Sequence, residues 1–131
     1  MNEDQLDTLN GRILLAVDDF VNQKVITAVF EKMGLQIEIA NDGAEAVKMA
    51  TISDYDLIFM DMQMPNMTGY EAAALLKEQG VTTPIVAQTA SAMKPDGQDC
   101  LDAGCDDYIS KPIDLAKLRQ VVSRYLNKAR S

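Results

Sequence analysis

Polar and charged side chains follow the short stretches of this 131-residue chain that are expected to form strands, at the points where those stretches end. They are Asp18 and Asp19 after residues 12–17, Asp61 after 57–60, Thr89 after 84–88 and Lys111 after 105–109. Carboxylates held close together repel one another unless a cation is bound between them, and oxygen ligands of this kind suit Mg²⁺. An aspartate beside Mg²⁺ can act as a nucleophile toward phosphorus, while a lysine ammonium and a threonine hydroxyl hold the phosphoryl oxygens. The residue types therefore favour phosphoryl transfer onto an aspartate.

The elements that must bring these groups together are five strands that alternate with five helices. Residues 57–60 are apolar without alternation, which is typical of a strand buried on both faces, whereas residues 35–40 alternate and predict a strand nearer the sheet edge. The pattern predicts helices over 21–33, after 41–43, over 70–79, over 95–103 and from Asp114 onward. This order predicts a parallel sheet covered on both faces. Because adjacent strand ends lie about 5 Å apart, the polar groups can converge on one pocket.

Composition excludes several other classes of protein. The chain is 47% hydrophobic with a formal net charge of −8, which predicts one acidic globular domain. That charge disfavours direct binding to nucleic acid or to an anionic membrane surface, and the absence of histidine removes Ser-His and Cys-His catalysis. The two cysteines, Cys100 and Cys105, form no metal-ligand or CxxC pattern, which favours a reduced, cytoplasmic location. No apolar run reaches membrane-spanning length, and the N-terminus lacks signal-peptide character. Residues 1–11 are predicted to be a tail or linker, and residues 12–131 the folded domain.

Four segments resemble, in their order and spacing, the receiver domain of two-component response regulators. They are VDD at 17–19, DLIFMDMQMPNMTGYEA at 56–72, PIVAQTASAM at 84–93 and AGCDDYISKPI at 103–113. The likeness covers about residues 12 to 128 and is greatest for receivers attached to hybrid histidine kinases, which often carry an MDxQMP-type segment. It implies an α/β fold, the flavodoxin-like doubly wound parallel sheet of five strands in the order 2-1-3-4-5.

The resemblance also implies a role for each matching residue. Asp61 matches the phosphoacceptor, Asp19 the direct Mg²⁺ ligand, Asp18 a neighbour that acts through water, and Gln63 a ligand through its backbone carbonyl. Lys111 matches the phosphate-binding lysine, Thr89 the switch hydroxyl and Tyr108 the switch aromatic, and a cis bond is expected before Pro112.

The function that the resemblance implies is Mg²⁺-dependent phosphorylation of Asp61 by a histidine kinase or a histidine phosphotransfer domain. Phosphorylation would switch the face formed by the fourth helix, the fifth strand and the fifth helix, which an output domain or partner protein would then contact. Such a domain is regulatory and catalyses only its own phosphoryl transfer and dephosphorylation. It would stand alone or form part of a larger sensor kinase.

Three alternatives stay open. Residues 20–23 after Asp19 form a stretch one residue shorter than the family's pattern, which is compatible with a receiver-like domain that no longer accepts phosphate and serves as a constitutive interaction module. A Mg²⁺-dependent phosphohydrolase would need a DxD motif and a cap domain, but Asp61 is followed by Met62 and Gln63. A flavin-binding module would need a phosphate loop after the first strand, where Asp18 and Asp19 would repel the phosphate.

Overall fold

The computed structural model describes residues 11–64, 66–89, 94–111 and 113–130. Most of the predicted tail and the predicted cis bond before Pro112 lie outside these residues. Strands and helices alternate along the described chain. In order they are β1 Arg12–Ala16, α2 Phe20–Lys32, β2 Gln36–Ala40, α3 Gly43–Ile52, β3 Leu57–Asp61, α4 Gly69–Glu78, β4 Ile85–Thr89, α5 Lys94–Ala103, β5 Asp107–Ser110 and α6 Leu115–Arg130.

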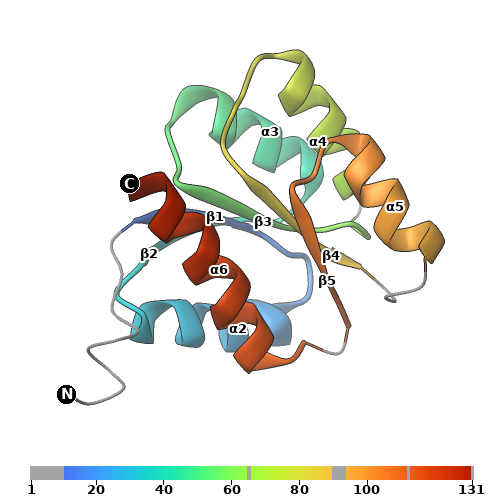
Figure 1. The fold of residues 1–131 in the computed structure, drawn as a ribbon. Helices are drawn as coiled ribbons and strands as arrows, with labels where there is room; N and C mark the ends of the chain where they lie inside the picture. The colour runs from blue at the N-terminus through green and yellow to red at the C-terminus, as the bar shows by residue number, and fades with distance from the viewer. Residues whose placement is uncertain (1–10, 65, 90–93, 112, 131) are drawn as a thin grey trace.

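The strands form one sheet in the order β2-β1-β3-β4-β5, and every neighbouring pair is parallel. The predicted fold class and strand order are therefore confirmed. Figure 1 shows α2 and α6 on one face of the sheet and α3, α4 and α5 on the other. The strand β2, whose alternating sequence indicated an edge position, lies at the edge. The strand β3 lies at the centre and is buried along its whole length.

Two apolar clusters fill the space between the sheet and the two helix layers. The first joins alternate strand residues to α2 and α6, and its centre holds the rings of Phe30 and Phe59, edge to face with centroids 6.2 Å apart. The second joins the intervening strand residues, among them Ile58 and Met60, to α3, α4 and α5. Because side chains alternate along a strand, the buried apolar residues of the central strands divide between the two clusters, which fixes the register of the sheet.

The helices begin at polar caps that the sequence supplies. Asp42 caps α3, Thr68 and Glu71 form a capping box on α4, and Asp114 Oδ1 accepts from the backbone of the first turn of α6. At its other end α4 stops at Gly80, which has a φ of +85°, a backbone conformation that glycine adopts without strain. These caps fix where each helix starts and hence where the loops at the carboxyl ends of the strands lie.

Candidate functional site

Asp61 is a charged residue almost completely enclosed by the fold. It is the last residue of β3 and is 2% exposed. Its Oδ1 accepts a hydrogen bond from the backbone N–H of Gln63 at 2.9 Å, and its Oδ2 accepts one from Lys111 Nζ at 3.1 Å. A buried carboxyl group without hydrogen-bond partners would be strongly destabilising, and these two bonds satisfy both of its oxygens.

Lys111 reaches Asp61 from 50 residues further along the chain. It follows β5, and its backbone N–H donates to the carbonyl of Thr89 at 2.8 Å, which fixes the start of the side chain against the end of β4. The lysine side chain is 32% exposed, whereas that of Asp61 is 3% exposed. One end of the ion pair is therefore sealed in the protein and the other is open to solvent. The predicted meeting of groups from distant strand ends is found for this pair.

Thr89 and Tyr108 lie on the neighbouring strands β4 and β5. Thr89 is the last residue of β4 and is fully buried. Tyr108 lies on β5, opposite Ala87 of β4, and its half-buried ring packs against the second apolar cluster. Both residues thus lie in the part of the sheet that connects Asp61 to α5 and α6.

Asp18 and Asp19 follow the end of β1, the strand beside β3, and both are exposed. Asp19 is the N-cap of α2, and its Oδ1 accepts from the backbone N–H of Val21 at 3.0 Å. Within the described ranges, no three acidic or other metal-ligating side chains lie close enough together to hold a metal ion. The three carboxylates that the sequence placed in one pocket are thus not gathered into a metal cluster in this structure.

The residue types at this edge nevertheless suit Mg²⁺. This ion retains several waters and is commonly bound through only one or two carboxylates, so a tight group of three is not required. Asp61 offers a buried carboxylate, and the exposed carboxylates of Asp18 and Asp19 stand at the end of the adjacent strand. Gln63 is exposed in the loop that follows β3. All of these groups are hard oxygen donors, which fits a hard cation.

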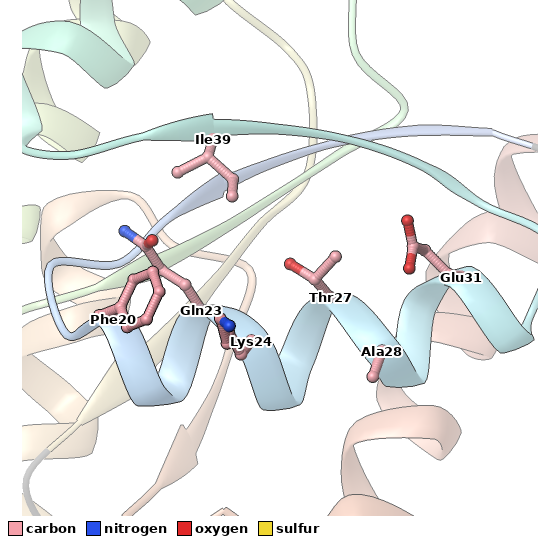
Figure 2. Close-up of a pocket in the computed structure, with 7 residues that line it drawn as sticks. All are labelled: Phe20, Gln23, Lys24, Thr27, Ala28, Glu31 and Ile39. Carbon is pink, nitrogen blue, oxygen red and sulfur yellow. The ribbon is translucent and has the colours of Figure 1, made fainter.

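A surface groove of about 380 Å³ lies along α2, beside the edge strand β2. It is lined by Phe20, Gln23, Lys24, Thr27, Ala28 and Glu31 of α2 and by Ile39 of β2 (Figure 2). Phe20 is 65% exposed there, and the Lys24 ammonium lies 4.8 Å from the centre of its ring. Neither Asp61 nor Lys111 lines this groove, so it is separate from the candidate site.

Two residues beside Asp61 were not singled out by the sequence analysis. Gln88 lies opposite Asp61 on β4 and is fully buried, and its only sequence signal was a polar side chain inside an apolar run. Gly69, the first residue of α4, donates its backbone N–H to the Met62 carbonyl at 3.1 Å. A Cβ at Gly69 would lie 2.5 Å from the Asp61 carbonyl oxygen, a crowding that no sequence pattern reveals.

Residues 13–123 match the response regulator receiver domain family. The chain belongs to this family. The receiver domain is also 45% identical over 119 residues to the hybrid signal transduction histidine kinase G of Dictyostelium discoideum, an alignment that covers 87% of this chain and 4% of that protein. The chain spans between 4% and 13% of the lengths of five curated histidine kinases that it matches. The predicted resemblance, including its leaning toward hybrid kinases, is confirmed.

Solved receiver domains have the same fold. The receiver domain of the sensor histidine kinase PA1611 from Pseudomonas aeruginosa, with a magnesium ion coordinated in its active-site cleft, matches with a TM-score of 0.83 and 37% identity over 90% of this chain and 98% of that one. A second match is the receiver domain of the Saccharomyces cerevisiae response regulator Ssk1, which was crystallised with the histidine phosphotransfer protein Ypd1. It matches with a TM-score of 0.85 and 30% identity over 92% of this chain and 91% of that one. In the described part of this receiver domain, no helix combines the length and apolar character needed to cross a bilayer.

Proposed function

We propose that this receiver domain accepts a phosphoryl group on Asp61 in a Mg²⁺-dependent reaction, with a histidine kinase or a histidine phosphotransfer protein as the donor. The observation that carries the proposal is the contact between the buried Asp61 carboxylate and the half-exposed Lys111 ammonium. An ion pair that only stabilised the fold would have no need of a carboxylate at the buried end of the central strand, because apolar residues serve there at least as well.

The chemistry follows from the groups at the end of β3. An Asp61 oxygen attacks phosphorus, and the phosphate donor leaves with the electron pair of the broken bond. The Lys111 ammonium, which bonds Asp61 Oδ2 in the free domain, then neutralises the phosphoryl oxygens, and the Thr89 hydroxyl donates to one of them. The backbone N–H of Gln63 holds the second carboxylate oxygen in place during the attack.

Asp18, Asp19, Asp61 and the backbone carbonyl of Gln63 would hold the Mg²⁺. When bound, the ion neutralises charge on the phosphoryl oxygens and on the carboxylates around them. The fit of these hard oxygen donors to the ion supports this assignment. It is also supported by the magnesium ion in the active-site cleft of the PA1611 receiver domain.

Phosphorylation is proposed to switch the face formed by α5, β5 and α6 (Figure 1). The movement of Thr89 toward the phosphoryl group would free space into which Tyr108 turns, and an output domain or partner protein would contact the repacked face. We further propose that residues 12–131 act as this receiver domain, preceded by a tail or linker at 1–11. It would work in the cytoplasm, alone or within a larger sensor kinase, without direct contact with nucleic acid or membrane.

The test is incubation with acetyl phosphate and Mg²⁺, followed by intact mass measurement. Wild-type protein should gain one phosphate and Asp61→Asn none. The matched control is Asp56→Asn, because Asp56 lies at the other end of the same strand, where it accepts a hydrogen bond from the Arg12 backbone, and its carboxylate is exposed. This variant should gain phosphate as the wild type does. A wild type without an adduct, or an adduct that persists in Asp61→Asn, would refute the proposal.

A second candidate is a receiver-like domain that does not accept phosphate and acts as a constitutive interaction module. The observation that favours it is the use of Asp19 as the N-cap of α2, which commits one oxygen of the proposed metal ligand to the helix. The two candidates differ in the response to Mg²⁺. Only the phosphoacceptor should form an adduct with Mg²⁺, form none when EDTA is present from the start, and form it again when excess Mg²⁺ is added.

A further inference from the structure

Gln88 is a buried polar residue whose side chain has no hydrogen-bond partner among the described residues. It lies within β4 and is fully buried, and neither Oε1 nor Nε2 bonds to any group in the described structure. Buried side-chain amides are normally paired, and an unpaired one is unfavourable for folding. An apolar side chain of similar size would avoid this penalty. The position of Gln88 should therefore explain why an amide is present.

The sheet places Gln88 directly beside Asp61. The two residues are opposite each other in the parallel pairing of β3 with β4, and the backbone N–H of Met62 donates to the Gln88 carbonyl at 3.0 Å. Residues opposite each other in neighbouring strands project to the same face, with side chains about 5 Å apart. Phe59 and Val86, two residues earlier on the two strands, both belong to the first apolar cluster. Alternation along the strands then directs Asp61 and Gln88 to that same face.

The Asp61 carboxylate has two donors in the described structure, and one of them is needed elsewhere during phosphoryl transfer. Lys111 Nζ bonds Oδ2, but this ammonium is the group that would neutralise a phosphoryl group on Asp61. The Gln63 N–H bonds Oδ1. When Lys111 turns to the phosphoryl oxygens, Asp61 loses this hydrogen-bond donor. A neutral donor that stays beside Asp61 would replace it. The buried carboxamide of Gln88 meets this need, because a neutral group is not drawn toward the phosphate as strongly as an ammonium.

We propose that Gln88 is a positioning residue for the phosphorylated state of Asp61, an inference that rests on the proposed function. Its Nε2 donates to the Asp61 carboxyl group once Lys111 has turned toward the phosphoryl oxygens. During hydrolysis a water oxygen attacks phosphorus, the bond between phosphorus and the Asp61 oxygen breaks, and its electron pair returns to Asp61. The water proton leaves with the inorganic phosphate. The negative charge that develops on Asp61 is stabilised by the amide, so Gln88 shortens the lifetime of the phosphorylated protein.

The test compares Gln88→Leu with Thr27→Val. Thr27 Oγ1 is also buried without a hydrogen-bond partner in the described structure. It lies on α2 and lines the groove to which Asp61 does not contribute. Both variants remove an unpaired polar group, so neither should lower the midpoint of urea unfolding. Only Gln88→Leu should lengthen the half-life of the adduct, by about threefold to tenfold, measured by intact mass after acetyl phosphate is removed. Gln88→Met gives the same comparison with an unbranched side chain if the leucine variant does not unfold cooperatively.

A second readout distinguishes positioning from a merely structural role. The side-chain amide resonances of Gln88 in a ¹⁵N-labelled sample should shift when acetyl phosphate and Mg²⁺ are added to the wild type, and should stay unchanged in Asp61→Asn. An adduct with the same half-life in wild type and in both Gln88 variants would overturn the inference and leave the proposed function intact. A wild type that forms no adduct would overturn both.

Discussion

The substitution Gly69→Ala tests whether close packing of α4 against the end of β3 holds Asp61 in place. A Cβ at this position would lie 2.5 Å from the Asp61 carbonyl oxygen and 2.7 Å from Met62 Cα. Both are backbone atoms that cannot rotate away, so the strand end and the helix start must separate. Overpacking of this kind costs about 1–3 kcal/mol, against a gain of up to about 1 kcal/mol from the higher helix propensity of alanine. We expect a net loss of about 1–2 kcal/mol, which lowers the unfolding temperature by roughly 3–8 °C.

The same displacement should slow phosphorylation much more than it lowers stability. Moving Asp61 away from Lys111 by a fraction of an ångström to 1 Å is expected to slow adduct formation from acetyl phosphate by roughly 10- to 100-fold. The matched control is Gly80→Ala at the other end of α4. There the φ of +85° makes alanine unfavourable by about 1–2 kcal/mol, but the added Cβ meets no atom within 4 Å.

Both variants should therefore be destabilised to a similar degree, and only Gly69→Ala should lose its phosphorylation rate. Adduct formation is followed by intact mass over time, and stability by urea and thermal unfolding of the same samples. The reasoning is refuted if Gly69→Ala is phosphorylated at the wild-type rate, or if Gly80→Ala slows to the same extent. In the second case a general loss of stability, rather than a shift of Asp61, would explain the effect.

Two further predictions concern charge. Lys111→Met leaves the Asp61 carboxylate buried without its cation and should lower the free energy of unfolding, measured in urea, by about 1–3 kcal/mol. The control Lys77→Met removes the lysine of an exposed ion pair and should change this free energy by less than about 0.5 kcal/mol. Equal effects of the two variants would contradict the idea that burial of Asp61 makes its pair with Lys111 the more important one. The hydrogen bond that the Arg12 side chain donates to Glu38 lowers the pKa of this carboxyl group below its usual value. The ionised Glu38 therefore contributes to stability above its unfolded-state pKa, and this contribution is lost as the pH falls through its lower folded-state pKa. The midpoint of urea unfolding should decline below about pH 4–5 in the wild type, and it should decline less steeply in Glu38→Gln.

Most of the fold could be predicted from local patterns. The apolar runs and helical spacing indicated every strand and helix of the described chain, because burial on a fixed period is a local property of the sequence. The order of the strands is set by which strands become neighbours, and no periodicity reports this. It came instead from the resemblance to receiver domains. The observed boundaries differ by one or two residues, as at β5, which begins at Asp107 instead of near residue 105.

The site was predictable only in part. The meeting of Asp61 and Lys111 follows from the rule that the carboxyl ends of parallel strands share one edge. The same rule predicts Asp19 at this edge, where its Oδ1 caps α2. Its role as a metal ligand stays a prediction. Gln88 carried a weak signal, a polar residue in an apolar run, which was interpreted only as part of the strand. The crowding at Gly69 depends on the packing of α4 against β3, which only coordinates reveal.

The two ends of the sheet show why the carboxyl end is the functional one. At the amino end, Asp56 accepts from the Arg12 backbone and Asp106 from the Ile85 backbone, and both acids are exposed. These acids satisfy strand ends at little cost to folding. At the carboxyl end, the fold buries the carboxyl group of Asp61 and leaves the amide of Gln88 beside it without a hydrogen-bond partner among the described residues. Both features oppose folding, and the apolar clusters above and below the sheet must offset them. Departures from well-satisfied packing that gather at one end of central strands are the physical mark of a site kept for chemistry.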